Sequence, residues 1–489
     1  MQNRERAVLI GHGPEEHRRE LAHMTASSRE PETAPLEEER TVPVAGSKVA
    51  RGSAWVRENP WFTGVFAVGV VLRVLAVVGY QPALWFPDTY TYVVTAIRPR
   101  PDLVRPAGYS FFLRLLEPFH SFGLVVVVQH LMGLAVAVLI YGAVRRKVLG
   151  VIAAAVVLLD AYQIQLEHLL VSDTLFLFLV VAATVLALKP PTWRRALAIG
   201  LLLAAATITR TVGLPLILVF LVLYGWRARK LTGVFAAGAL VPVLAYGIWF
   251  HAAHDRIGLV GANGAFLYVR VMPFADCSIM KPPADLAVLC DDRAVRPPAQ
   301  DYVWDPTSPL VRLPGETFTA ENDALAQRFA LLAITSQPGD YLAAVARDLV
   351  RAFEPGRPVY PNAEVYAAYE FPVTVPAEPQ TRDTLGVELA RRYENGPIST
   401  QVIEPVAAWL RNYQSVLALP GPLLLLVLLG PVIAVRRSDV LIPWAVAWAL
   451  LVVPAATAVF DYRYVLPAAP LAFLAAALAL SPATSAKCK

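Results

Sequence analysis

Apolar runs dominate this sequence and limit what it can fold into. A helix needs about 20 mostly apolar residues to cross a hydrocarbon core of about 30 Å. The chain is 56% hydrophobic and 17% charged, which is more apolar and less charged than a soluble domain. We therefore predict an all-α polytopic membrane protein with about ten transmembrane helices. The predicted segments are 61–80, 122–144, 148–160, 172–188, 196–209, 211–226, 231–250, 416–435, 440–459 and 464–480.

Basic residues lie in alternate connections between these segments, at 145–147, 189–195, 227–230 and 436–437. Cytoplasmic loops of membrane proteins are enriched in Lys and Arg. Threading ten spans through these connections puts both termini in the cytoplasm, so we expect a multi-pass protein of the plasma membrane. The same loops account for the net charge of +5 without a nucleic-acid partner.

Four regions follow from this pattern. The first region, residues 1–56, is polar and too poor in apolar residues to order itself, and it has no apolar stretch typical of a cleavable signal peptide. Two stretches of the third region, 320–335 and 338–353, have the spacing of helices. The regions are a disordered cytoplasmic tail at 1–56, an N-terminal transmembrane module at 57–250 with a first outer loop at 81–121, an extracytoplasmic loop or lid of short helices and coil at 251–415, and C-terminal transmembrane helices with a short cytoplasmic tail at 416–489.

The first outer loop carries Asp88 directly after Pro87, with Tyr90, Tyr92 and Tyr109 nearby. A carboxylate at the membrane interface stays ionised and can accept a proton from an incoming hydroxyl, which is the work of a general base. The aromatic side chains are candidates for contacts with the acceptor, meaning the molecule that carries this hydroxyl. The alternative is that Asp88 only stabilises the turn after the proline.

The second outer connection, 160–173, holds Glu167, His168 and Asp173 between two apolar segments. Ionisable groups at this depth are functional candidates. Glu167 and Asp173 are therefore candidates to orient an acceptor or bind a divalent cation, although both can also form hydrogen bonds within the bundle. Asp173 can equally cap the helix that follows it. A zinc site is not predicted, because His168 has no companion histidine nearby.

Three arginines, Arg105, Arg210 and Arg463, lie in outer connections. Guanidinium groups hold phosphate through forked hydrogen bonds, so together they are candidates to bind a phosphate. Local pairing, for instance of Arg463 with Asp461, or contact with lipid headgroups is the alternative.

Cys277 and Cys290 lie in one outer loop, where a disulfide is stable against reduction. We predict a structural disulfide between them. No glycine-rich nucleotide loop is present, so chemistry driven by cytosolic nucleotides is not expected.

Five short motifs, taken in order, resemble the GT-C superfamily of polytopic glycosyltransferases, in particular the branch of protein mannosyltransferases and the lipid A aminoarabinose transferase. Two departures stand out: Thr89 and Ala107 occupy positions where many relatives have Glu and Pro. The similar motifs are Phe86-Pro87-Asp88-Thr89-Tyr90, Arg105-Pro106-Ala107-Gly108-Tyr109, the acidic hairpin from Glu167 to Asp173, Thr209-Arg210-Thr211-Val212-Gly213 and Tyr462-Arg463-Tyr464-Val465-Leu466-Pro467.

The resemblance implies an inverting transferase that moves a sugar from a polyprenyl-phosphate donor to a cell-envelope glycan, lipid or protein outside the cytoplasm. It assigns Asp88 as the base and Arg210 and Arg463 to the departing phosphate, with Glu167 or Asp173 positioning the acceptor or an ion. Two other classes remain open. One is a transporter or flippase for lipid-linked or polar solutes, and the other is a non-catalytic envelope-assembly protein with the same fold.

Overall fold

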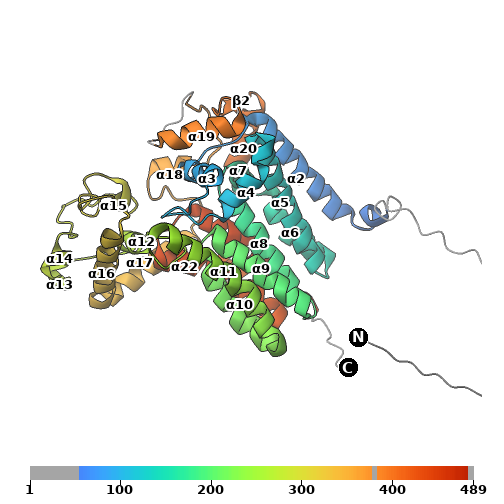
Figure 1. Cartoon of the computed structure of the whole chain (residues 1–489). Helices are drawn as coiled ribbons and strands as arrows, with labels where there is room; N and C mark the ends of the chain where they lie inside the picture. Colours follow the sequence, from blue (N-terminus) through green and yellow to red (C-terminus); the bar gives the residue numbers. More distant parts are fainter. Residues whose placement is uncertain (1–53, 377–380, 382, 483–489) are drawn as a thin grey trace, which may run out of the picture. The chain divides into compact units, whose positions relative to one another are not determined.

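The structure is a computed structural model and describes residues 54–376, 381 and 383–482 (Figure 1). The chain separates into two compact units, Met1–Ala54 and Trp55–Lys489, and only the second is described below. The predicted N-terminal tail therefore lies almost entirely outside the described residues. Within the second unit nearly every element is a helix, which agrees with an all-α membrane protein.

Five helices of the described residues are long and apolar enough to cross a membrane, or up to seven spans if two bent helix pairs are included. The prediction of ten spans is therefore wrong. The five are α2 (Pro60–Gly79), α5 (Phe122–Ala143), η2 with α11 (Arg229–His254), α22 (Ser438–Thr457) and η4 with α23 (Tyr462–Ala479). The bent pairs are α6 (Lys147–Leu159) with α7 (Ala161–His168), and α20 (Val406–Val416) with α21 and η3 (Gly421–Ala434).

Fewer spans than predicted are present because several of the apolar runs form helices that are too short to cross a membrane. Helix α8 (Asp173–Leu188) has 16 residues and α10 (Gly213–Arg227) has 15. At 1.5 Å per residue they are about 24 Å and about 22 Å long, shorter than the hydrocarbon core. Between them, α9 (Trp193–Thr209) begins with a tryptophan and two arginines.

Asp160 explains why α6 and α7 do not form one straight helix. Its backbone ends α6, and one carboxylate oxygen accepts a hydrogen bond from the backbone N–H of Gln163 in the first turn of α7. The other oxygen accepts from the N–H of Leu419, which lies in the break between α20 and α21. The two breaks thus satisfy each other's backbone groups, as a broken helix inside a membrane protein must.

Small residues let α9 and α11 pack closely. A methyl group on Gly200 would lie 2.4 Å from the carbonyl oxygen of Phe235, so only glycine fits there. Close approach through small residues is the usual way in which membrane helices associate. The largest apolar core runs through these helices together with α2, α5, α6, α8, α10, α22 and α23.

The region after α11 forms mostly short helices, and both stretches predicted as helical, 320–335 and 338–353, are confirmed by α16 and α17. A second core lies beneath α12 and α16 and includes the predicted disulfide between Cys277 and Cys290. The helices are α12 (Asn263–Val271), α13 (Cys277–Met280), α14 (Ala284–Ala287), α15 (Asp301–Trp304), α16 (Ala320–Ser336), α17 (Pro338–Arg351), α18 (Ala363–Ala367) and α19 (Thr384–Glu394).

The elements near the end of α2 bring this region onto the first loop. Strand β1 (Tyr80–Gln81) pairs antiparallel with β2 (Gln401–Val402), with Tyr80 opposite Val402. Helix α19 packs on α3 (Pro87–Ile97), which is followed by α4 (Gly108–Leu116) and η1 (Glu117–Phe119) (Figure 1). Residues far apart in the sequence therefore meet around the N-terminus of α3.

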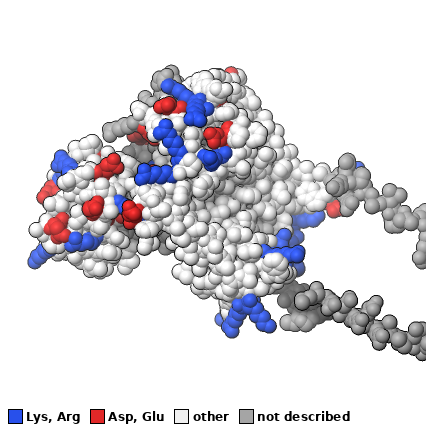
Figure 2. Space-filling view, viewed as in Figure 1, with Lys and Arg blue, Asp and Glu red and all other residues white. Residues whose placement is uncertain are grey.

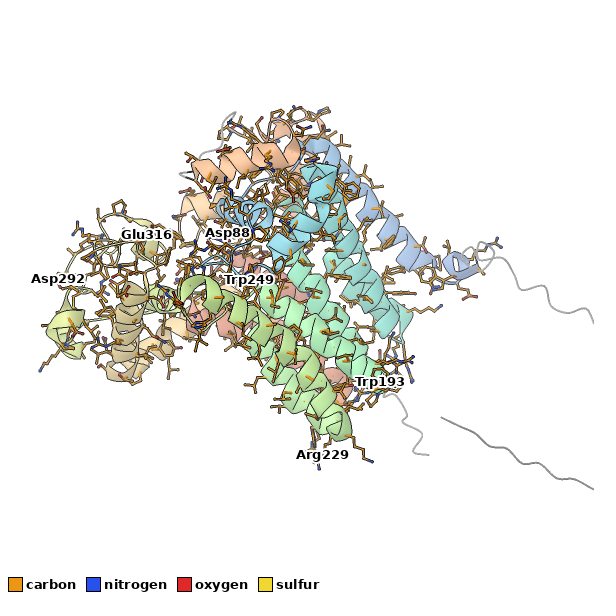
Figure 3. The ribbon with its side chains drawn as sticks, in the orientation of Figure 1. Asp88, Trp193, Arg229, Trp249, Asp292 and Glu316 are labelled. Atoms are coloured by element: carbon orange, nitrogen blue, oxygen red, sulfur yellow. A yellow bond between two sulfur atoms is a disulfide. The ribbon has the colours of Figure 1, made fainter. Side chains whose placement is uncertain are left out.

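Charged residues gather at the two ends of the helices. On the face shown in Figure 2, a wide band of uncharged residues separates a mixed group of acids and bases from basic residues at the other end. Figure 3 shows Asp88 at the first end and Arg229 and Trp193 at the other. This separation agrees with the predicted grouping of the basic connections on one side.

Candidate active site

Local sequence fixes the position of Asp88 at the start of α3. Pro87 occupies the first helical turn, where its missing N–H costs nothing. The hydroxyl of Thr89 accepts a hydrogen bond from the N–H of Phe86 and donates one to the carbonyl oxygen of Leu170. Thr89 therefore ties the helix start to the neighbouring chain, and the carboxylate of Asp88 makes no capping bond of its own.

Two arginines hold Asp88 instead. Its Oδ1 lies 2.5 Å from Nη2 of Arg105, and its Oδ2 lies 3.2 Å from Nη1 of Arg463. The side chain of Asp88 is only 12% exposed. Burial alone would raise the pKa of Asp88, but the two guanidinium charges outweigh burial and hold that pKa well below its ordinary value. In this arrangement Asp88 is ionised and a weak base.

A second pair lies beside the first. Asp173, at the start of α8, forms an ion pair with Arg210, which directly follows α9. The ring of Tyr464 contacts both Arg210 and Arg463, with centroid distances of 5.4 Å and 5.8 Å. Asp461 completes the group, since its Oδ2 lies 3.1 Å from Nε of Arg463.

We call these six residues, Asp88, Arg105, Asp173, Arg210, Asp461 and Arg463, the charged cluster. It contains three carboxylates and three guanidiniums. Two of its buried polar atoms have neither a hydrogen bond nor an ion-pair contact with any described residue: Nε of Arg105 and Oδ2 of Asp173. Buried polar atoms are rarely left unpaired, so this donor and this acceptor mark a place for a polar ligand.

The structure brings five of the predicted site residues together in this cluster, but it places Glu167 elsewhere. It is fully buried and its carboxylate contacts Nε of Arg73 at 2.8 Å and Nδ1 of His130 at 3.0 Å. Nε2 of His130 lies 3.1 Å from Nδ1 of His168, and Nε2 of His168 lies 2.7 Å from the carbonyl oxygen of Tyr80. Glu167 thus joins α2, α5 and α7 inside the bundle and does not face the charged cluster.

The sequence contained a signal for this network that the motif analysis missed. Arg73 is a lone arginine in the apolar run of the first segment, and a charge at such a position needs a buried partner. Two of the three tyrosines predicted to contact an acceptor have buried partners within the protein. Tyr92 donates to Oγ of Ser172, and Tyr109 donates to Oε1 of Gln129, both in buried surroundings.

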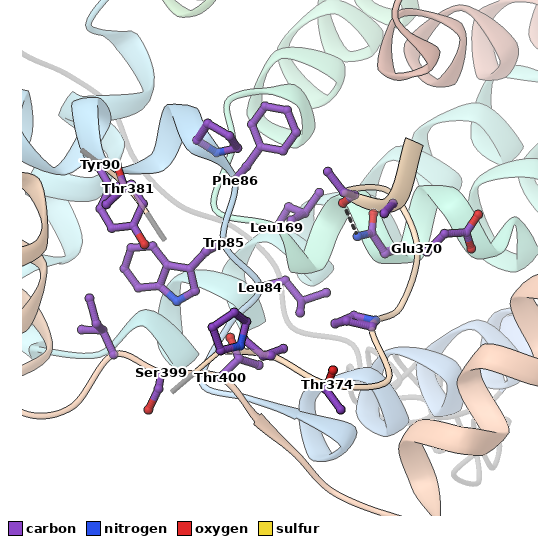
Figure 4. Close-up of a pocket in the computed structure, with 18 residues that line it drawn as sticks. Leu84, Trp85, Phe86, Tyr90, Leu169, Glu370, Thr374, Thr381, Ser399 and Thr400 are labelled. Carbon is purple, nitrogen blue, oxygen red and sulfur yellow. Dashed lines mark hydrogen bonds between the residues drawn. The ribbon is translucent and has the colours of Figure 1, made fainter. Parts of the chain in front are cut away.

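The third tyrosine, Tyr90, lines a cavity of about 290 Å³ (Figure 4). Phe86 and Pro87 also line it, directly before Asp88 in the sequence. Its opposite wall comes from the region between α18 and β2. We call this space the Trp85 cavity.

A larger cavity, of about 700 Å³, is lined in part by Tyr462, which lies between Asp461 and Arg463 in the sequence. Arg351, Arg357 and Arg411 line it, and α21 and α23 contribute apolar residues such as Leu424 and Val465. Arg357 is ion-paired with Glu370, yet its Nε and Nη1 have no hydrogen-bond partner among the described residues. We call this space the Arg357 cavity, and Glu370 lines both cavities.

The described residues contain no group of three or more His, Cys, Asp or Glu side chains arranged to hold a metal ion. No family model matches the chain, and no curated protein or solved structure matches it either. Fold and site together define a class, an all-α membrane protein with a buried charged cluster and two cavities that are lined by sequence neighbours of the cluster residues.

Proposed function

We propose that this protein is a membrane glycosyltransferase that moves a sugar from a polyprenyl-phosphate donor to an extracytoplasmic acceptor with inversion. The observation that carries the proposal is the contact of one carboxylate, Asp88, with two arginines from distant parts of the chain. The reaction needs a base for the acceptor hydroxyl and cations for the leaving phosphate. The charged cluster supplies both within one group of side chains.

In the proposed reaction the hydroxyl oxygen of the acceptor attacks the anomeric carbon, and the bond from that carbon to the phosphate oxygen breaks. The hydroxyl proton passes to Asp88, and the polyprenyl phosphate leaves with the electron pair of the broken bond. Arg463 and Arg105 first turn from Asp88 to the donor phosphate. Asp88 then loses the charges that depress its pKa and becomes a better base.

The Arg357 cavity supports a lipid-linked donor. It combines arginines with an apolar wall from α21 and α23, which are segments apolar enough to lie in a membrane. An isoprenoid chain needs such a wall, and a phosphate needs cations beside it. The cavity and the charged cluster are connected through neighbours in the chain, since Tyr462 lines the first and the next residue, Arg463, belongs to the second.

The test is sugar transfer in liposomes that contain the purified protein and a panel of radiolabelled polyprenyl-phosphate sugars. Replacing Asp88 by Asn keeps the shape of the side chain and removes the base, so turnover should fall about 100-fold or more. Asp285→Asn is the matched control, because Asp285 forms an exposed pair with Arg328 far from the cluster in sequence.

Unchanged turnover in Asp88→Asn would contradict the assignment of the base. Movement of the labelled donor across the bilayer without formation of a new glycosidic bond would instead place the protein among transporters.

A further inference from the structure

The Trp85 cavity contains a fixed aromatic pair. The rings of Trp85 and Tyr90 are stacked, with centroids 5.1 Å apart and an angle of 20° between the planes. Trp85 also forms an edge-to-face pair with Phe122, with ring centroids 5.2 Å apart, so the indole is held from a second direction. Figure 4 shows both rings at the cavity, with Ser399 and Thr400 on the facing segment.

Two polar atoms at this cavity have no partner among the described residues. One is the indole N–H of Trp85, a donor, and the other is Oε1 of Gln165, an acceptor. Gln165 is 1% exposed, and its amide nitrogen donates to the carbonyl oxygen of Ala368 at 3.1 Å. That bond fixes the amide and leaves Oε1 available, so the cavity offers one buried donor and one buried acceptor in fixed positions.

The remaining wall is polar but nearly uncharged. Among the described residues that line the cavity, only Glu370 carries a charge, and Arg357 and Tyr162 both contact its Oε1. Hydroxyls come from Thr374, Thr381, Ser399 and Thr400. Among these described residues a charged ligand would meet a single carboxylate that is already paired with Arg357, whereas a neutral ligand rich in hydroxyls would find partners on several sides.

We infer that the Trp85 cavity binds a neutral hexopyranose ring, and that this ring is the acceptor end of the proposed transfer. Sugar C–H bonds pack well on aromatic rings, since the ring faces are electron-rich. A sugar hydroxyl is both donor and acceptor, so hydroxyls of one ring can satisfy the Trp85 N–H and the Gln165 oxygen together. The cavity of about 290 Å³ is large enough for one such ring. The role as acceptor rests on the proposed function, and the binding of a sugar does not.

The experiment measures binding without any donor. Methyl hexopyranosides of gluco, galacto and manno configuration are titrated into the full-length protein in detergent, with saturation-transfer NMR as the readout. At least one of them should receive saturation from the protein. Trp85→Phe keeps an aromatic ring and removes the N–H, and should weaken binding about fivefold or more.

Ser399→Ala is a milder second variant in the facing wall, where loss of a hydroxyl should weaken binding about twofold to fivefold. Trp304→Phe is the matched control, because Trp304 is 48% exposed and lies in α15, outside the cavity. It should leave binding unchanged, and thermal unfolding should confirm that all three variants are folded.

Absence of saturation transfer to every glycoside at 50 mM concentration, roughly the weakest affinity that matters for a site of this size, would overturn the inference. So would equal binding by wild type and by folded Trp85→Phe and Ser399→Ala. Binding that depends on Trp85, in a protein that transfers no sugar from any donor, would uphold the cavity and defeat the proposed function. Sugar transfer that is unchanged in both Trp85→Phe and Ser399→Ala would uphold the proposed function and defeat the role of the Trp85 cavity.

Discussion

Asp88 and Arg463 are 375 positions apart in the sequence, and Oδ2 of the first lies 3.2 Å from Nη1 of the second. One stands at the start of α3, and the other stands at the start of the segment that contains α23. The contact depends on the packing of the whole bundle. It is therefore sensitive to changes in the helices that bring these two ends together, as well as to changes in the pair itself.

Replacing Arg463 by Gln removes one of the two charges that lower the pKa of Asp88. Burial raises that pKa and Arg105 alone opposes it less, so the pKa of Asp88 should rise. The acid limb of turnover against pH should then move to higher pH, because Asp88 becomes protonated at a higher pH than in the wild type. Maximal turnover should also fall about 100-fold through loss of a phosphate contact. A pH–rate profile of liposome-reconstituted protein measures both effects.

Arg328→Gln serves as the control for this profile, since Arg328 is 55% exposed and pairs only with Asp285 among the ion pairs of the described residues. Its acid limb should coincide with that of the wild type. An Arg463→Gln profile that overlays the wild-type profile would show that Arg463 does not act on Asp88.

Breaking the buried pair of Arg73 and Glu167 should destabilise the bundle. Glu167→Gln would leave Arg73, whose side chain is 3% exposed, without its counter-charge. Removal of one partner from a buried pair costs about 3–5 kcal/mol. The loss is measurable as a shift in the unfolding midpoint in mixed detergent micelles. The exposed-pair variant Asp285→Asn should lose less than about 1 kcal/mol. Equal losses in the two variants would be incompatible with a buried ionic network at Glu167.

Gly133 on α5 makes room for the same carboxylate. A methyl group there would lie 2.0 Å from Oε1 of Glu167, so Gly133→Ala must displace Glu167 or separate the helices. Small-to-large changes in a packed core cost about 1–3 kcal/mol. Gly142, on the same helix, has no atom within 4 Å of such a methyl group. Gly142→Ala should be neutral or stabilising by up to about 1 kcal/mol. The difference in unfolding midpoint between these variants is the test, and no difference would contradict the packing.

The residues of the charged cluster were largely predictable, because polar residues between apolar segments must gather at the ends of the bundle. Asp88, Arg105, Asp173, Arg210 and Arg463 all satisfy that rule. Glu167 breaks it, because α7 follows a 51° bend and turns its side chain into the core. A hydropathy pattern contains no information about that bend, which depends on a capping bond from Asp160.

The two cavities were not predictable from the sequence. Each is walled on one side by residues between α17 and α20, where the sequence has many prolines and little periodicity. Trp85, Gln165 and Arg357 do not belong to any motif that is recognisable in the sequence. Their importance comes from unpaired atoms beside a cavity, which only the three-dimensional arrangement shows. The number of membrane spans was overpredicted for a similar reason, because apolar composition does not reveal where a helix ends.

Equal numbers of carboxylates and guanidiniums in the charged cluster have a consequence for the timing of the proposed reaction. An arriving phosphate competes with Asp88 for the same arginines, so loading the donor and freeing the base become a single event. After transfer, attraction between Asp88 and those arginines favours expulsion of the spent carrier. The salt bridges of the unliganded cluster would then form again and return the site to its starting arrangement after each cycle of the proposed reaction, without a separate energy source.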